Sequence, residues 1–150
     1  MVDVIEKRLD AAQKLGASAV INARNENTLN RVAELTGGRG ADKVIETADS
    51  KFAIKQTPYL VKRGGTIVLV GLAPKDIIDF DIMQIMTKEA EIKSVFRYRN
   101  LYPAAIGAIA DGKINVKDIV THEFEFEDSK KAFDYVIENK NDVVKAVIRI

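Results

Sequence analysis

The sequence contains no cysteine and no tryptophan, and His122 is the only histidine in its 150 residues. A chain without cysteine forms no disulfide framework, and this composition fits a reducing compartment. A catalytic zinc needs three protein ligands drawn from cysteine, histidine and carboxylates, a set that one histidine does not supply. We therefore expect no metal ligand in this chain, and a structural or surface role for His122.

Long apolar runs and a charge imbalance are also lacking. The longest apolar stretch, TIVLVGLA, is far shorter than the roughly 20 residues that a membrane-spanning helix needs. The N-terminal stretch MVDVIEKRLD is charged and periodic, unlike a signal peptide. The net charge of +1 provides no basic surface for nucleic acid. These absences predict a soluble, cytoplasmic domain that has neither a membrane nor a nucleic acid as its partner.

Strand-like and helix-like segments alternate along the chain, which is typical of an α/β fold with a parallel sheet. Strands are expected at 1–3, 19–22, 43–48, 66–71, 91–96, 121–127 and 145–150. Helices are expected at 6–16, 27–38, 50–65, 82–86, 101–112 and 128–139. Pro58 should kink or shorten the third helix, and Asn100 should cap the fifth. The segment 66–71 is apolar at nearly every position, so both of its faces should be covered.

Asp3 stands at the end of the first strand-like segment, directly before a helix. A carboxylate at the end of the second strand of a Rossmann half can bind both ribose hydroxyls of adenosine, which favours NAD over NADP. Arg8 follows five residues later, where its guanidinium could stack on the adenine. The alternative is that Asp3 is a helix N-cap and Arg8 a solvated surface charge. The spacing leaves both interpretations open.

A glycine fingerprint for a dinucleotide pyrophosphate is not found. The only glycine-dense stretch, GGRGAD at 37–42, follows a helix and precedes a strand, which is the reverse of the required order. We interpret this stretch as a helix end and a loop. The FRYRN stretch at 96–100 instead follows a predicted strand, at the end where open α/β sheets bind ligands. It is either a ligand-contacting segment or a basic, aromatic surface loop.

Taken together, several motifs resemble the zinc-dependent medium-chain dehydrogenases. DVIEKRL, GGRGADKVIETA, RGGTIVLVGL, EIKSVFRYRN and VTHEFEFEDSKKAFD occur in the order and spacing of that family, and VFRYRN with VTH resembles its sorbitol (polyol) dehydrogenase branch. The resemblance covers the whole chain, which corresponds to the C-terminal part of such an enzyme. It implies a Rossmann-type sheet with helices on both faces that lacks its first strand. It also implies an NAD-binding domain at 1–112 and a β-α-β segment of the catalytic domain at 113–150.

The resemblance also implies roles for individual residues. Asp3 and Arg8 match the adenosine-binding pair, and Arg97 and Tyr98 match positions that contact the polyol. Ala48 stands where the family usually has glycine. The remaining cofactor-binding positions, most of which line the nicotinamide, are Thr47, Val70, Gly71, Leu72, Val95, Phe96 and Arg97. In the family the zinc ligands and the proton relay lie in the N-terminal half, so no catalytic residue is expected here.

The function implied is the NAD-binding portion of an oxidoreductase that oxidises a polyol or secondary alcohol by hydride transfer, with the isolated chain inactive. The absence of the central strand predicts new pairing, either between the strands at 1–3 and 43–48 or by strand exchange in a homo-oligomer. One alternative is a non-catalytic oligomerising remnant or a subunit of a split enzyme. A methyltransferase-like domain is a third interpretation, which the VFRYRN and VTH motifs disfavour.

Overall fold

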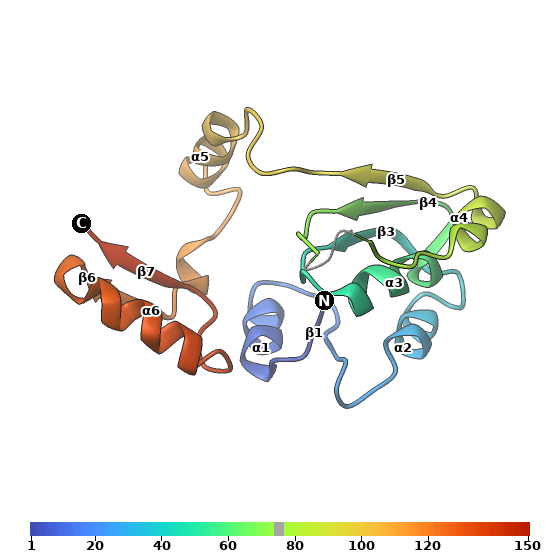
Figure 1. Ribbon diagram of the computed structural model, residues 1–150. Helices are drawn as coiled ribbons and strands as arrows, with labels where there is room; N and C mark the ends of the chain where they lie inside the picture. The colour runs from blue at the N-terminus through green and yellow to red at the C-terminus, as the bar shows by residue number, and fades with distance from the viewer. Residues whose placement is uncertain (74–76) are drawn as a thin grey trace. The chain divides into compact units, whose positions relative to one another are not determined.

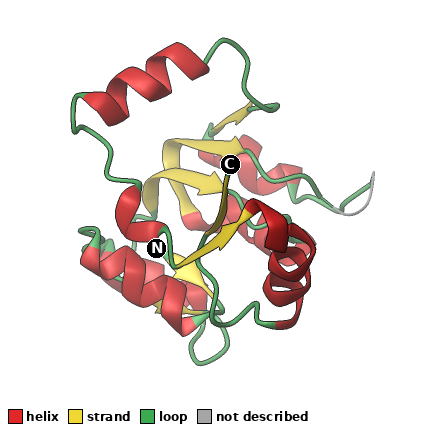
Figure 2. Cartoon of the chain, turned by 90° about the vertical axis from the view of Figure 1, so that its left-hand side faces the viewer, coloured by secondary structure: helices red, strands yellow, loops and turns green. Residues whose placement is uncertain are grey.

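The computed structural model describes residues 1–73 and 77–150 and shows helices alternating with strands (Figures 1 and 2). The strands are β1 (Val2–Asp3), β2 (Ile21–Asn22), β3 (Ala41–Glu46), β4 (Val61–Leu69), β5 (Glu91–Ser94), β6 (His122–Glu125) and β7 (Ala146–Arg149). The α-helices are α1 (Glu6–Lys14), α2 (Thr28–Leu35), α3 (Lys51–Leu60), α4 (Ile82–Lys88), α5 (Tyr102–Ala110) and α6 (Ser129–Glu138). Short 3-10 helices cover Lys117–Ile119 and Phe126–Asp128. No helix in the described ranges is long and apolar enough to span a bilayer.

The chain divides into two compact units. Unit 1 comprises Met1–Glu26 and Asn100–Ile150, and unit 2 comprises Asn27–Arg99. Unit 1 contains two parallel pairs, β1 with β2 and β6 with β7, the latter joined through α6. Unit 2 contains one parallel sheet in the order β3-β4-β5. The parallel α/β organisation predicted from the alternation is confirmed.

The pairing of the strands corrects one expectation. Pairing of β1 with β3 inside the chain was one of two expected arrangements, yet in the described residues β1 pairs with β2 and β3 pairs with β4 alone. The register of β1 with β2 is short, because only Val2 and Asp3 have strand partners, Ile21 and Asn22. The outer edge of β3 therefore has no strand partner in the described part of the chain.

The core of unit 2 lies between the sheet and its helices. Val61 and Ile67 of β4 are fully buried and contact Ile85 of α4. In Figure 1, α3 runs alongside β3 and β4. Thr66 and Val68, which flank Ile67, are only half-buried. The apolar segment 66–71 predicts that both faces of this strand are covered, and within the described residues this coverage is incomplete.

The junction between α3 and β4 differs from the prediction. Pro58 lies inside α3, which ends at Leu60, and β4 begins at once at Val61, five residues before the predicted start. The ammonium of Lys88 donates hydrogen bonds to the carbonyls of Pro58 at 2.8 Å, Tyr59 at 3.1 Å and Val61 at 2.7 Å. A cation at this place satisfies carbonyls that a helix C-terminus leaves without partners. Burial lowers the pKa of Lys88, and the nearby Arg63 lowers it further.

The helix ends agree with the local signals in most places. The Asn27 side chain accepts a hydrogen bond from the Asn30 amide and caps α2. Gly16 has a φ of +100° after α1, as expected of a helix stop. Asn100 is not the cap of α5, because Leu101 occupies that position and makes no side-chain cap bond. Asn100 instead has a φ of +54°, a left-handed conformation that asparagine tolerates in a turn.

Candidate functional site

Asp3 and Arg8 lie together in unit 1. The Asp3 carboxylate accepts hydrogen bonds at Oδ1 from the amides of Val4 at 2.7 Å and Ile5 at 3.0 Å. Its second oxygen, Oδ2, lies 3.8 Å from Nη1 of Arg8. Helix α1 begins at Glu6 with Ile5 as its cap, so Asp3 shapes the turn before the helix and is not the N-cap itself. The half-buried pair presents one carboxylate oxygen beside a guanidinium.

The ends of β1 and β2 are tied together around Asp3. The Ala23 amide donates to the Asp3 carbonyl at 3.0 Å, and the Asn22 side chain donates to the Glu6 carboxylate at 2.6 Å. These bonds fix the carboxyl ends of two parallel strands. Ligands of open α/β sheets bind at such ends.

The other predicted residues lie in unit 2, beyond the carboxyl ends of β3, β4 and β5. The register Glu46–Leu69–Ser94 sets the three strand ends side by side. The Val95 amide donates to the Leu69 carbonyl at 2.9 Å. Thr47, the segment 70–72 and the segment 95–98 therefore begin at one edge of the sheet. The structure brings these predicted residues together within unit 2, while Asp3 and Arg8 belong to unit 1.

Sequence reasoning missed two acidic residues at this edge. Glu46 is only 4% exposed, and its Oε1 accepts a hydrogen bond from the Ala48 amide at 2.7 Å. Asp49 has a φ of +52°, and its Oδ1 accepts from the Leu72 amide at 2.6 Å. The signal was a charged residue inside an apolar strand, KVIET, followed directly by the turn-forming ADS. A buried carboxylate normally needs hydrogen-bond partners, so a glutamate inside an apolar strand indicates that donors lie close to it.

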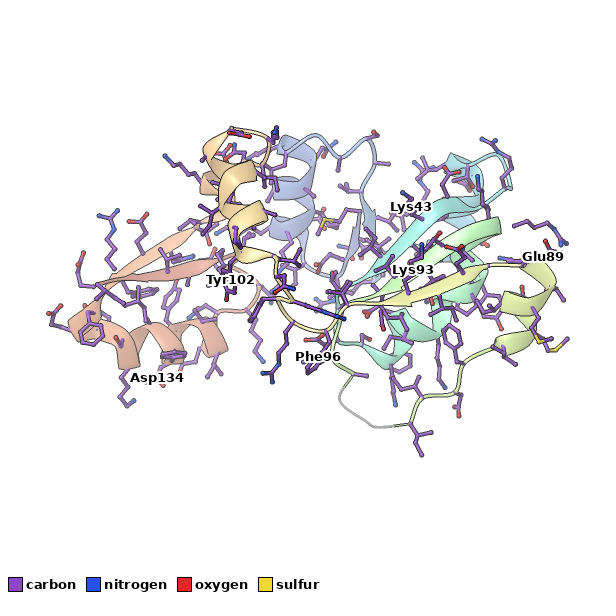
Figure 3. All side chains as sticks on the ribbon, turned by 90° about the horizontal axis from the view of Figure 1, so that it is seen from above. Lys43, Glu89, Lys93, Phe96, Tyr102 and Asp134 are labelled. Carbon is purple, nitrogen blue, oxygen red and sulfur yellow. The ribbon has the colours of Figure 1, made fainter. Side chains whose placement is uncertain are left out.

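The segment that follows β5 is exposed and left-handed at one point. Arg97 has a φ of +56°, and its guanidinium carbon lies 5.2 Å from the centre of the Phe96 ring. Phe96 is 67% exposed and Tyr98 is 64% exposed. Figure 3 shows Phe96 beyond the strand that carries Lys93. These side chains offer cationic, phenolic and aromatic groups at the sheet edge.

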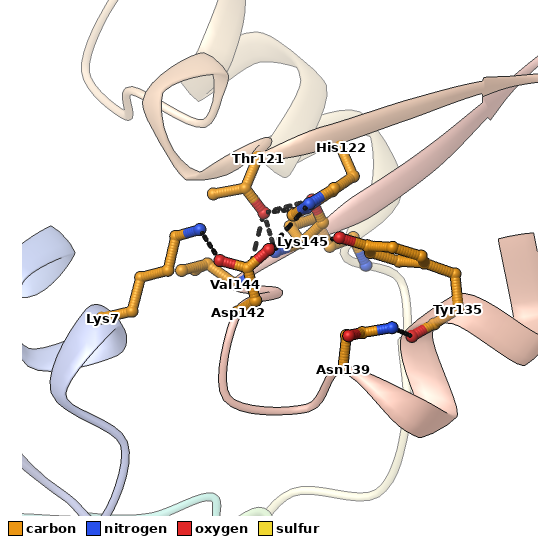
Figure 4. A network of polar contacts seen from close by, with 8 residues as sticks. All are labelled: Lys7, Thr121, His122, Tyr135, Asn139, Asp142, Val144 and Lys145. Atoms are coloured by element: carbon orange, nitrogen blue, oxygen red, sulfur yellow. Dashed lines mark hydrogen bonds and ion pairs between the residues drawn. The ribbon is translucent and has the colours of Figure 1, made fainter.

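His122 belongs to a polar network in unit 1 (Figure 4). Its Nε2 lies 3.3 Å from Oδ2 of Asp142, which also accepts a hydrogen bond from the Tyr135 hydroxyl at 3.3 Å. The ammonium of Lys7 contacts the other carboxylate oxygen at 2.5 Å, and this hydrogen bond is the main cause that lowers the pKa of Asp142. The Thr121 hydroxyl lies 2.9 Å from His122 Nδ1. These contacts agree with a structural role for His122.

A metal site is not assembled by the described residues. No group of three or more histidine, aspartate or glutamate side chains within residues 1–73 and 77–150 could hold an ion. A surface hollow of about 390 Å³ runs along α6, lined by Glu127, Asp128, Lys130, Lys131, Asp134, Tyr135 and Glu138. It contains none of the predicted site residues. The candidate site therefore rests on the strand ends and not on this hollow.

A family model described as zinc-binding dehydrogenase matches residues 1–111. The chain belongs to the zinc-binding dehydrogenase family. An uncharacterized zinc-type alcohol dehydrogenase-like protein of Escherichia coli (strain K12) is 46% identical to it over 150 residues, or 100% of this chain and 43% of that protein. Sorbitol dehydrogenase of Bacillus subtilis (strain 168) is 32% identical over 148 residues, or 99% and 42%.

The solved structure of a similar protein shares the fold. An alcohol dehydrogenase (rspB) of Escherichia coli CFT073, solved in complex with NADH, is 25% identical and superimposes with a TM-score of 0.86, over 99% of this chain and 43% of that one. The Rossmann-type class predicted from the sequence is thereby confirmed. The chain spans a little over two fifths of the length of these relatives.

Proposed function

We propose that the chain is the NAD-binding portion of an alcohol or polyol dehydrogenase. The observation that carries the proposal is the assembly of Thr47 and the segments 70–72 and 95–98 at one edge of a parallel sheet, where such folds bind ligands. Family membership and a relative solved with NADH support it.

Each group of residues has a distinct role in this proposal. The Asp3 carboxylate would accept hydrogen bonds from the adenosine ribose, and the Arg8 guanidinium would stack on the adenine. The backbone of segments 70–72 and 95–97 would hold the nicotinamide, while Arg97 and Tyr98 would bind substrate hydroxyls. NAD, when bound, supplies the hydride acceptor.

The same residues test the choice between cofactors. Titration of the chain with NADH and NADPH, followed by nicotinamide fluorescence, should show NADH binding at least about tenfold more tightly, since a 2′-phosphate would be repelled by Asp3. Asp3→Asn should reduce this preference, whereas Asp10→Asn, an exposed position of α1, should leave it unchanged. The proposal would be rejected if the unsubstituted chain bound both dinucleotides with equal affinity, or if it bound neither of them.

We also propose that the isolated chain has no turnover. The family uses zinc, and the described residues provide no fitting ligand set, so we derive no step through zinc. NAD reduction with sorbitol should therefore be undetectable in purified material. Turnover that a chelator abolishes would contradict this expectation.

Finally, we propose a cytoplasmic homo-oligomer built by strand exchange. The support is the outer edge of β3, which has no strand partner in the described residues and carries Ile45 with 63% of its surface exposed. Light scattering at micromolar concentration should give a mass above the 16.6 kDa of one chain. A strictly monomeric species would count against exchange.

A further inference from the structure

Glu46 is the most unusual titratable residue of unit 2. It is 4% exposed, and its Oε2 is the one buried side-chain oxygen in the described residues without a hydrogen-bond partner. Burial of a carboxylate is unfavourable when its oxygens are not satisfied. The adjacent Ile45, which would gain from burial, is instead 63% exposed. Burial of apolar surface therefore does not account for the position of Glu46.

The Glu46 carboxylate is packed directly against Gly71. A Cβ atom built on Gly71 would lie 2.6 Å from Glu46 Oε2, and 2.9 Å from both the amide nitrogen and Oδ1 of Asp49. These separations are shorter than van der Waals contact, so no side chain fits there without movement of the 46–49 turn. The absence of a side chain at Gly71 is what allows the two turns to approach.

Hydrogen bonds join the same two turns. The Glu46 carbonyl accepts from the amides of Val70 at 2.9 Å and Gly71 at 3.1 Å. The Glu46 side chain holds the Ala48 amide, and Asp49 holds the Leu72 amide. Three consecutive amides, at 70, 71 and 72, thus depend on acceptors of the 46–49 turn. That turn fixes the backbone which the proposed function assigns to the nicotinamide.

We propose that Glu46 is a positioning residue that holds the backbone of residues 70–72 in place for the nicotinamide end of the cofactor. This inference rests on the proposed function for its ligand, while the structural half stands without it. Glu46 acts through the turn and through its contact with Gly71, since its buried carboxylate is not available to touch a ligand. Loss of the Glu46 carboxylate should therefore weaken the hydrogen bonds that hold the amides of residues 70–72, and it should weaken binding of the nicotinamide end of the dinucleotide.

The first test is amide hydrogen exchange, measured by NMR on the full chain without ligand. Glu46→Gln keeps the shape of the side chain but removes the charge that strengthens its bond to the Ala48 amide. We expect exchange at Ala48, Gly71 and Leu72 to accelerate about tenfold, the change that follows from weakening one charge-assisted hydrogen bond. Glu34→Gln is the matched control, because Glu34 lies on α2 and its carboxylate forms an exposed ion pair with Arg31. An unchanged rate at these amides, or an equal acceleration across unit 2, would overturn the inference.

The second test separates the two ends of the ligand. Affinity for NADH should fall about tenfold in Glu46→Gln, the loss expected when an ordered backbone must be reordered on binding. Affinity for AMP, which lacks the nicotinamide, should stay the same. Equal losses for both ligands would overturn the positioning role. If the unsubstituted chain binds neither, the proposed function fails, and the exchange experiment still decides whether Glu46 holds the 70–72 backbone.

A second variant keeps the inference testable if Glu46→Gln does not fold. Gly71→Ala retains the carboxylate but places a methyl group against it and against the Asp49 amide. It should accelerate exchange at Ala48 and Leu72 and weaken NADH binding without affecting AMP. Gly107→Ala is the control, because a Cβ on this glycine of α5 meets nothing within 4 Å. Normal exchange and NADH affinity in Gly71→Ala would contradict the close packing on which the inference depends.

Discussion

Lys88 provides a direct test of how α3 and β4 are held together. Its ammonium donates to three carbonyls at the end of α3 and the start of β4, between 2.7 and 3.1 Å away. Lys88→Met retains most of the aliphatic stem but removes every one of these donors. A hydrogen bond to a charged group contributes about 1.5–3 kcal/mol, and solvent can replace part of it at a half-buried site. We expect the free energy of unfolding to fall by about 2 kcal/mol.

Urea unfolding followed by far-ultraviolet circular dichroism measures this loss. With a slope of about 2 kcal/mol per molar urea, the midpoint should fall by about 1 M while the slope stays constant. Lys55→Met is the matched control on α3, since within the described residues the Lys55 ammonium forms just an exposed ion pair with Asp79 and should change the midpoint little. Identical midpoints for the two variants would refute the view that Lys88 closes the α3–β4 junction.

Three further predictions concern other parts of the chain. Asp142→Asn should lower the melting temperature at pH 7. The difference should disappear on acidification. The pKa of the Asp142 carboxyl is lowered in the folded protein, so the charged carboxylate stabilises the fold fully only above the unfolded pKa of about 4. This stabilisation is lost as the pH falls through the folded pKa. Asn27→Ala should cost about 1 kcal/mol in urea unfolding, whereas Ser50→Ala, at a cap position without a side-chain cap bond, should cost little. Ile67→Val should cost about 1 kcal/mol by the same measurement, and Ile45→Val almost nothing, since the first side chain is fully buried and the second is exposed.

Features that depend on neighbouring residues were predictable from the sequence. The cap at Asn27 and the helix stop at Gly16 each depend on contacts within one helical turn. The parallel pairing followed from the alternation of strands and helices. The approximate positions of the predicted site residues followed too, because residues after parallel strands meet at one edge of the sheet.

Features that depend on distant residues were not predictable in this way. Strand β4 begins at Val61, and the carbonyl of this residue accepts a hydrogen bond from Lys88, which lies 27 residues later in the sequence. Glu46 and Gly71 are 25 positions apart, and neither residue by itself indicates their contact. Hydrophobic alternation along β3 would also favour burial of Ile45, whereas the structure buries the neighbouring carboxylate. Pattern analysis misses such contacts because they are set by the packing of two strands and their turns.

Departures from local rules in unit 2 are concentrated at the carboxyl edge of its sheet. Glu89 also has a positive φ, but it ends α4, where a left-handed residue is the usual helix C-cap. Asp49 and Arg97 have positive φ without any helix to end, and each lies three residues beyond the end of a strand that forms this edge. Buried Glu46 is the last residue of β3 and lies near Asp49. Such backbone strain and a buried, partly unsatisfied carboxylate are unfavourable for stability, and they coincide with the edge to which the proposed function assigns the nicotinamide.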